Sequence, residues 1–265
     1  MASAHNDVPG TAAFTKFMNV LQAVSDAPQP PSVTELSKTL GYPRPTTHRI
    51  VAALLAEGML LELGGDSRLG LGPRLIGLAY KAWEGSDLRV IAEPFIERLR
   101  DTLDETVHLA MRSGQEMIYI SKLESRRTVR MASRVGTRVT LYSSSVGKAW
   151  LSQQPRDEVR SALAALQMRT FTAKTTTDVD ALIGEIEQSA ARGYTTDIEE
   201  NEEDICCYGC PIVTASQGVI ACVSVSMPSY RFHALDAQQA ITAIQDCTRA
   251  IAEQMQTRMG GRSLG

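Results

Sequence analysis

The chain has 265 residues, of which 43% are hydrophobic and 22% are charged, and its formal net charge is −3. This length and composition indicate an ordinary globular protein with room for two modest domains, not a fibrous or disordered chain. The sequence has no apolar run near the roughly 18 residues of a membrane span, no signal-peptide pattern in its first ten residues, and five cysteines without disulfide-like spacing. We therefore expect a cytoplasmic protein without a membrane partner.

The N-terminal segment begins with residues 1–12, which we expect to be disordered. A helical stripe follows, and the proline-rich segment Pro28–Pro31 ends it. The stripe consists of Phe14, Phe17, Met18, Leu21 and Val24. It opens a predicted DNA-binding domain over residues 13–71.

The segment from Ser32 to Gly58 predicts a helix, a tight turn and a second helix. Ser32 and Glu35 have the spacing of a capping box, which starts the first helix. Gly41 can adopt the left-handed conformation that ends it. Pro43 and Pro45 fall where the second helix begins, and first-turn residues have no intrahelical N–H partner to lose.

Polar side chains crowd the first turns of the second helix, as in a helix that enters the major groove of DNA. The candidate DNA contacts are Arg44, Thr46, Thr47, His48 and Arg49. The alternative is that these side chains form a solvated helix face. For His48, the alternative to reading a base is a structural role or a contact with a phosphate.

The charge distribution supports DNA binding only locally. The first 84 residues carry seven basic and seven acidic side chains, so they have no net positive charge. However, the stretch from Leu36 to Ala56 holds Lys38, Arg44, His48 and Arg49 and no acidic residue. Such a basic face can bind phosphates although the rest of the surface is acidic.

Two short strands around Gly64–Ser67 are expected next, as the wing of a winged helix. Arg68, near the tip of this wing, is a candidate for a phosphate or minor-groove contact. Residues 72–85 continue with helical spacing and predict a linker helix, which places the domain boundary near Gly85.

The second half predicts a mixed domain over residues 86–258, followed by a tail at 259–265. Its expected helices lie at 88–103, 146–153, 156–166, 178–192 and 236–255, and its expected strands lie at 106–111, 117–123, 128–132, 138–142 and 218–226. Strands with flanking helices favour an α+β or α/β fold whose sheet can hold a small molecule.

The order of these parts resembles the IclR-type bacterial transcription regulators from about Phe14 to about Gln256. The segments that carry the resemblance are Thr34–Ser37, Gly41–Arg49, Leu71–Leu75, Glu105–Leu109, Arg130–Gly136, Val146–Ala149, Arg192–Tyr194, Asp197–Glu200 and Val223–Ser226. The resemblance implies an N-terminal winged helix-turn-helix, a linker helix and a C-terminal GAF-like α/β effector-binding domain. It also implies dimers, or tetramers built from dimers.

The resemblance further implies where an effector binds. The family's pocket falls on Ser145, Val146, Gly147, Asp197, Cys207, Ser224 and Ser226. Two serines two residues apart on one strand can both donate to a carboxylate, and backbone N–H groups near Gly147, at a helix start, would add to an anion site. The alternatives are that both serines are ordinary sheet residues and that Asp197 is a cap or turn former.

Three departures from the family's usual pattern stand out. Pro45 replaces a usual serine, which affects a first-turn phosphate contact. The segment Asn201–Asp204 is more acidic than usual, and Cys206 and Cys210 add thiols. Arg130 and Arg134 could bind a ligand carboxylate, with surface salt bridges as the alternative.

The sequence therefore predicts a DNA-binding regulator, not an enzyme, with operator DNA and a small metabolite as partners and without a metal or cofactor. The cysteines lack a second pair at metal-ligand spacing. The alternatives are an enzyme acting on a small molecule and a thiol sensor built on Cys206, Cys207 and Cys210.

Overall fold

The computed structural model describes residues 10–64, 67–84, 87–129 and 131–262. They belong to two compact units, Met1–Ser86 and Asp87–Gly265. No helix in the described part of the chain is long and apolar enough to cross a membrane.

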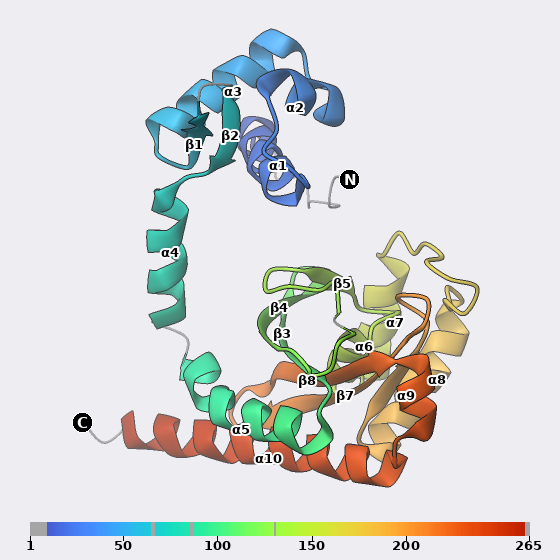
Figure 1. Cartoon of the computed structure of the whole chain (residues 1–265). Helices are drawn as coiled ribbons and strands as arrows, with labels where there is room; N and C mark the ends of the chain where they lie inside the picture. Colours follow the sequence, from blue (N-terminus) through green and yellow to red (C-terminus); the bar gives the residue numbers. More distant parts are fainter. Residues whose placement is uncertain (1–9, 65–66, 85–86, 130, 263–265) are drawn as a thin grey trace. The chain divides into compact units, whose positions relative to one another are not determined.

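The first unit is a small helical domain with a two-stranded wing (Figure 1). Its elements are α1 (Ala12–Asp26), α2 (Val33–Leu40), α3 (Arg44–Ala56), β1 (Leu60–Leu63), β2 (Arg68–Leu71) and α4 (Pro73–Glu84). Val20, Leu36, Ile50, Leu54 and Leu69 join helices α1, α2 and α3 and the wing in one core. The predicted hairpin turn includes residues 65–66, which lie outside the described part.

The start and end of α2 have the predicted chemistry. The Ser32 hydroxyl accepts from the Glu35 backbone N–H, and the Glu35 carboxylate accepts from the Ser32 N–H at 2.7 Å, which completes a capping box. Gly41 ends the helix at φ 66°, in the left-handed region.

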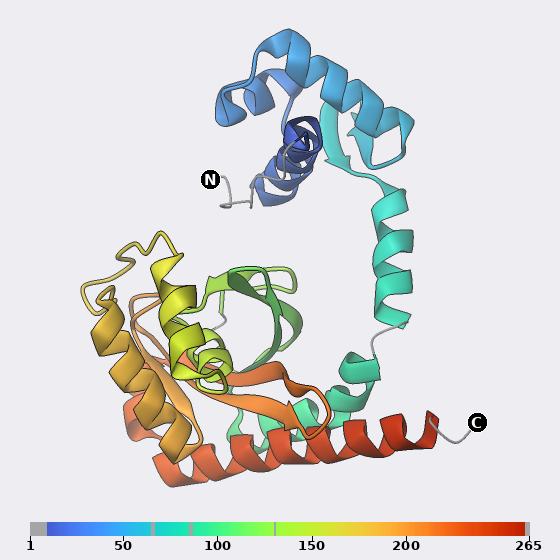
Figure 2. The same ribbon diagram turned by 180° about the vertical axis from the view of Figure 1, so that it is seen from behind.

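The second unit contains one six-stranded sheet with helices on both faces (Figures 1 and 2). Its helices are α5 (Asp87–Leu103), α6 (Ser145–Leu151), α7 (Arg156–Ala164), α8 (Val179–Arg192), α9 (Ser229–Ala234) and α10 (Ala237–Arg262). Its strands are β3 (Thr106–Ser113), β4 (Glu116–Leu123), β5 (Arg138–Thr140), β6 (Thr195–Ile198), β7 (Ile205–Thr214) and β8 (Gly218–Pro228).

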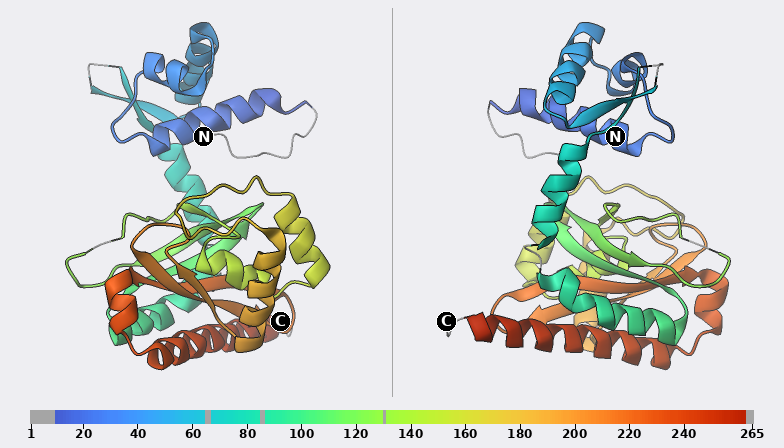
Figure 3. Two further views of the ribbon diagram at one scale, coloured as in Figure 1. Left: turned by 90° about the vertical axis from the view of Figure 1, so that its right-hand side faces the viewer. Right: turned by 60° about the vertical axis from the view of Figure 1, so that its left-hand side comes forward.

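The strand order is β5-β4-β3-β8-β7-β6, and every neighbouring pair is antiparallel. The domain is therefore an α+β fold with a curled antiparallel sheet, and a parallel α/β arrangement is not found. Helices α5 and α10 pack side by side against one face (Figure 3). Helices α6, α7 and α8 cover the other face, over a second apolar core.

Two glycines let α6 lie directly on its neighbours. A Cβ at Gly147 would come within 2.3 Å of the Thr140 carbonyl oxygen, and one at Gly209 on β7 would come within 2.6 Å of the Ser145 carbonyl oxygen. Both contacts are with backbone, which cannot move aside as a flexible side chain can. These positions therefore require glycine for space.

Three sequence predictions need correction. Of residues 128–132, those that the structure describes do not form a strand. They lie in the loop between β4 and β5 and pair with no other strand. The tail predicted from residue 259 begins later, since α10 extends to Arg262. At the other end, α1 begins at Ala12, inside the segment predicted to be disordered.

The glycine contacts give a stability prediction with a matched control. Gly147→Ala should lower the free energy of unfolding of the second unit by at least about 2 kcal/mol, because backbone must shift to relieve the overlap. Gly184→Ala, in the middle of α8 with open space around its Cβ, should instead raise it by about 0.5–1 kcal/mol. Urea unfolding of the two variants measures both changes, and equal effects would refute the close-approach argument.

Candidate functional site

Helix α3 presents one polar face that the domain core does not cover. Arg44, His48 and Arg49 are exposed on it, and Thr46 is half-buried. Arg44 and His48 are four residues apart and so lie on the same side of the helix. Within the described residues, neither arginine has a carboxylate at ion-pair distance, so both guanidinium groups can donate to phosphate oxygens or to acceptors on base edges.

Thr47 does not belong to this face. Its side chain is 0% exposed, packs with Ile50, Val51 and Leu54, and bonds the Pro43 carbonyl oxygen. The helical period explains the difference, since residues 47, 50, 51 and 54 form the core-facing stripe. Thr47 is therefore a packing residue and is not available for DNA contact.

Arg68 also has hydrogen-bond partners within its own domain. Its guanidinium donates to the Glu35 carboxylate at 2.7 Å and to the Pro30 carbonyl oxygen at 3.2 Å, although the side chain is half-exposed. Glu35 thus caps α2 and ties β2 to it. Both contacts use Nη1, so the predicted phosphate contact would fall to the other N–H groups of this half-exposed guanidinium.

In the second unit, polar residues from different strands meet on the face of the sheet that α6 covers. Cross-strand partners point to the same face. One row across the sheet runs Asp197, Cys207, Ser226 and Thr106. The neighbouring row runs Thr195, Gly209, Ser224, His108 and Lys122. We call these two rows the polar face.

The polar face brings together four of the predicted effector residues, and α6 adds a fifth. Asp197, Cys207, Ser224 and Ser226 are all buried on it. Cys207 pairs directly with Ser226 across the β7–β8 ladder, and Ser145 lies near its thiol. The Thr195 hydroxyl also donates to the Ser145 carbonyl oxygen at 2.7 Å, which fixes the start of α6 over the sheet.

Val146 and Gly147 have different surroundings. Val146 is buried in the apolar core beneath α6, and Gly147 is packed against the backbone of Thr140 and Leu141. The Gly147 N–H donates to the Ser144 hydroxyl at 3.1 Å, as part of the cap of α6. This N–H is therefore not free for the anion contact that was predicted for backbone N–H groups near Gly147.

Asp197 is a buried carboxyl with an unusual proton affinity. Burial raises its pKa to about 7, and the nearby Glu200 charge adds to this increase. The Glu200 and Asn201 N–H groups, which donate to Oδ1, and the nearby Lys148 charge act in the opposite direction and lower the pKa. Asp197 is therefore partly protonated near neutral pH and can act either as a donor or as an acceptor. Its predicted alternative role as a turn former is also present, through these two N–H contacts.

Lys148 stabilises the same corner of the site and was not singled out from the sequence. Its side chain is 0% exposed, and its ammonium donates at 2.7 Å to Glu185 of α8 and to both carboxylate oxygens of Glu200. The sequence feature that could have indicated this role is a lysine placed among the small and apolar residues of α6. The cluster links α6, α8 and the turn after β6.

His108 is a second residue of the site that was not among the effector contacts expected from the sequence. Its ring stacks on Tyr119 with centroids 4.2 Å apart, and its Nε2 lies 2.8 Å from the Ser133 hydroxyl. Its Nδ1 lies 3.4 Å from both the Ser224 and the Ser226 hydroxyl. Burial, and then the charge of Lys122, lowers the pKa of His108 to about 3, so the ring is neutral near pH 7.

The cysteines do not have the surroundings of a thiol sensor. Cys206, Cys207 and Cys210 are buried, and burial raises the pKa of each thiol. A reactive cysteine instead needs a lowered pKa and exposure. Among the described residues, no three histidine, cysteine or acidic side chains are grouped so that they could hold a metal ion.

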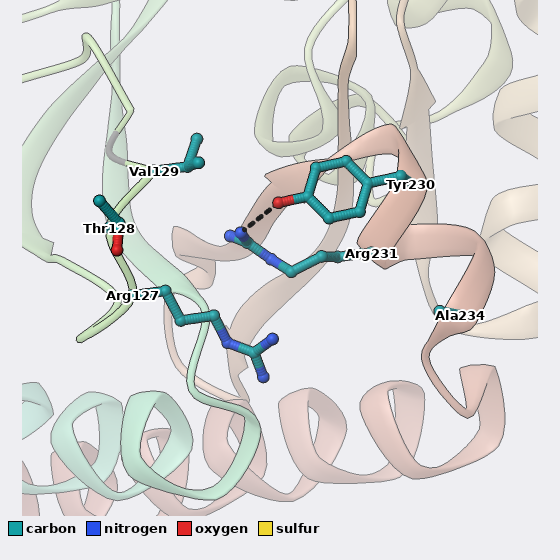
Figure 4. A pocket seen from close by; sticks show the side chains of 6 residues that line it. All are labelled: Arg127, Thr128, Val129, Tyr230, Arg231 and Ala234. Carbon is teal, nitrogen blue, oxygen red and sulfur yellow. Dashed lines mark hydrogen bonds between the residues drawn. The ribbon is translucent and has the colours of Figure 1, made fainter.

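Two surface hollows lie apart from the polar face. One has a volume of about 370 Å³ between the β4–β5 loop and α9, and Arg127, Tyr230 and Arg231 line it (Figure 4). Its arginines are paired with Asp104 and Glu105 respectively. The other hollow, of about 700 Å³, lies between α5 and α10. Of the two arginines proposed for a ligand carboxylate, Arg134 is exposed and Arg130 lies outside the described residues.

Comparison with known families matches both units. Residues 80–253 match the family described as "Bacterial transcriptional regulator IclR C-terminal", and residues 13–63 match the "IclR helix-turn-helix domain". The chain belongs to the IclR family. It is thus a transcriptional regulator with a helix-turn-helix domain and an effector-binding domain, as the sequence predicted.

Named relatives and solved structures agree with this IclR-family assignment. The chain is 30% identical to the regulator KdgR of Escherichia coli K12 over 92% of each protein, and 33% identical to the repressor AllR of that strain over 84% of this chain and 82% of AllR. The crystal structure of the Thermotoga maritima IclR has a TM-score of 0.71 at 27% identity, and the match covers 91% of this chain and 97% of that one.

Protonation of Asp197 gives a pH prediction. Because its pKa is higher in the folded chain than the usual 3.8, its contribution to stability is complete below about pH 4 and is lost as the pH rises through about 7. Asp197→Asn resembles the protonated form and keeps an acceptor for the two N–H groups. Relative to this variant, the wild type should lose stability between about pH 4 and about pH 7 in urea unfolding, and the difference should level off above that range. If the difference in the free energy of unfolding between the two proteins did not change with pH, that result would contradict the raised pKa.

Proposed function

We propose that the chain is a cytoplasmic, ligand-responsive regulator that binds a pseudo-palindromic operator and whose binding is altered by a small metabolite. The observation that carries the DNA half of this proposal is the exposed polar face of α3, formed by Arg44, Thr46, His48 and Arg49. Cytoplasmic action is proposed because the DNA that a bacterial regulator addresses lies there.

The geometry of α3 supports entry into a major groove. Its core stripe holds the helix against α1 and α2, while the opposite side projects the guanidinium groups of Arg44 and Arg49, which have no carboxylate partner among the described residues. Recognition helices of this class contact base edges through their N-terminal residues. Pro45 is exposed in the first turn and cannot donate a backbone N–H, so the phosphate contact is assigned to the arginines.

Removal of these arginines tests the DNA interface. Arg44→Ala with Arg49→Ala should weaken binding to the DNA upstream of the chain's own gene at least about 100-fold, since each contact to a base or phosphate is worth about 1–3 kcal/mol. The slope of log affinity against log salt concentration should also become shallower. Fluorescence anisotropy measures both.

The matched control removes the same charge elsewhere. Arg156→Ala with Arg160→Ala changes two arginines of α7, which form ion pairs with Glu187 and Asp180 in the second unit. This variant should retain operator affinity within about twofold, in line with the small effect of remote surface charges. Equal losses in both double variants would show that net charge, and not α3, determines binding.

For the effector half, the polar face offers several buried hydrogen-bonding groups, and the apolar core beneath α6 lies on the same face of the sheet. We propose that Ser145, Asp197, Cys207, Ser224 and Ser226 contact a small carboxylate or aromatic metabolite there. An IclR homologue from Microbacterium hydrocarbonoxydans was solved with 4-hydroxybenzoate, and it has a TM-score of 0.80 to this chain at 22% identity, covering 93% of this chain and all of that one. That complex supports the ligand class as a proposal for this chain.

The two serines provide the test of the effector site. Ser224→Ala with Ser226→Ala should leave operator binding unchanged and should weaken the binding of responding carboxylates at least about tenfold, because two hydroxyl donors are lost. Calorimetry with a series of small carboxylates, beginning with 4-hydroxybenzoate, measures this affinity. Ser161→Ala, on the exposed side of α7, is the control, and an unchanged affinity in the double variant would contradict the proposed site.

Self-association as a dimer or tetramer is part of the proposal. The first unit exposes large apolar side chains on α1 and α4, with Phe14 66% exposed and Ile76 73% exposed. A two-fold arrangement would cover such side chains and place two α3 helices on successive major grooves. We also propose a catabolic operon as the target, on the resemblance alone.

A further inference from the structure

His108 and two serines form a buried polar group with weak internal hydrogen bonds. His108, Ser224 and Ser226 are all buried, yet both hydroxyls lie 3.4 Å from the same ring nitrogen, Nδ1. Good hydrogen bonds of this kind have heavy-atom distances near 2.8 Å. The three groups therefore retain capacity for a partner placed between them.

The other ring nitrogen has a firm partner. Nε2 lies 2.8 Å from the Ser133 hydroxyl, and the Ser133 carbonyl oxygen accepts from the Lys122 ammonium at 2.5 Å. A neutral imidazole carries one N–H, and a serine hydroxyl can donate to the nitrogen that lacks it. Where Ser133 donates to Nε2, the ring hydrogen resides on Nδ1 and points towards Ser224 and Ser226, and this is the tautomer that we assign.

Charge on the polar face differs between its two ends. Lys122 occupies the position next to His108 in its row, and its ammonium contacts Glu124 and two carbonyl oxygens. At the other end, the carboxyl groups of Asp197 and Glu200 lie together. Asp197 is two strands away from Ser226, or about 10 Å at the usual strand spacing. An anion is therefore favoured beside His108 and disfavoured beside Asp197.

We propose that His108 is a direct effector ligand, whose Nδ1–H and the hydroxyls of Ser224 and Ser226 together receive the effector's carboxylate. The effector then directs an uncharged hydrogen-bonding group towards Asp197. Stacking on Tyr119 fixes the plane of the ring, so the N–H is oriented before the ligand arrives. This inference rests on the proposed effector site and states which end of that site receives the carboxylate.

Two substitutions separate the ring nitrogens. His108→Asn places an amide near the position of Nδ1, and His108→Gln places one near the position of Nε2. The probe is acetate, the simplest carboxylate, titrated at constant ionic strength against the full chain and followed by ligand-observed NMR. We expect H108N to bind acetate within about threefold of the wild type and H108Q to bind it at least about tenfold more weakly, since a hydrogen bond to a charged group is lost.

Several outcomes would overturn the inference. One is retained binding in H108Q with loss in H108N, which would mean that the ring acts only through Ser133. Unchanged binding in both variants, or no binding of acetate to the wild type at about 0.1 M, would also do so. If either variant fails to fold, the side-chain ¹⁵N spectrum of His108 in the wild type decides the matter. We expect a protonated Nδ1 whose signal moves with acetate, and an unprotonated Nδ1 would refute the proposal.

Operator binding separates this inference from the proposed function. Acetate binding that depends on His108 without any effect of carboxylates on operator affinity would retain the anion site and refute the regulatory role. An operator response that is intact in H108Q would retain the regulatory role and refute the assignment of His108.

Discussion

The second unit depends on the close contact between α6 and the sheet. Gly209 on β7 admits the Ser145 carbonyl, and Gly147 admits the backbone of Thr140 and Leu141. Thr195 then bonds to Ser145, and Lys148 anchors the helix from its buried side. Without this contact, the polar face would be open to water, and its hydrogen bonds would be weak. A larger side chain at either glycine would lift α6 away from the sheet.

Burial of charge gives the site its electrostatic character. Lys148 is buried and paired with the buried Glu200 and the half-buried Glu185, so a broken pair would leave an uncompensated charge in the interior. Asp197 lies beside this cluster and holds its proton to near neutral pH, because burial raises its pKa and the Glu200 charge adds to this effect. His108, at the other end, is kept neutral by the same burial. The site therefore presents uncharged donors at one end and a carboxyl group poised to titrate at the other.

The sequence predicted local features well and cross-strand features less well. Capping by Ser32 and the left-handed Gly41 depend on neighbours within a few residues, and both were found. Thr47 was misassigned because core and surface positions alternate within one helical turn. His108 and Ser133 become partners only through the pairing of β3, β4 and β8 and the path of the following loop, which local spacing does not encode. Similarly, the partners of Lys148 are 37 and 52 residues away.

The central claim is that ligand binding at the polar face and DNA binding by α3 change each other's affinity within one chain. Thermodynamic linkage makes this directly measurable, because the operator must change the affinity for the ligand by the same factor by which the ligand changes the affinity for the operator. The ligand for this measurement is the small molecule that calorimetry identifies as binding in a Ser224- and Ser226-dependent way. The account predicts equal factors of roughly fivefold or more in anisotropy and calorimetry. Full occupancy of the polar face with no change in operator affinity would contradict it.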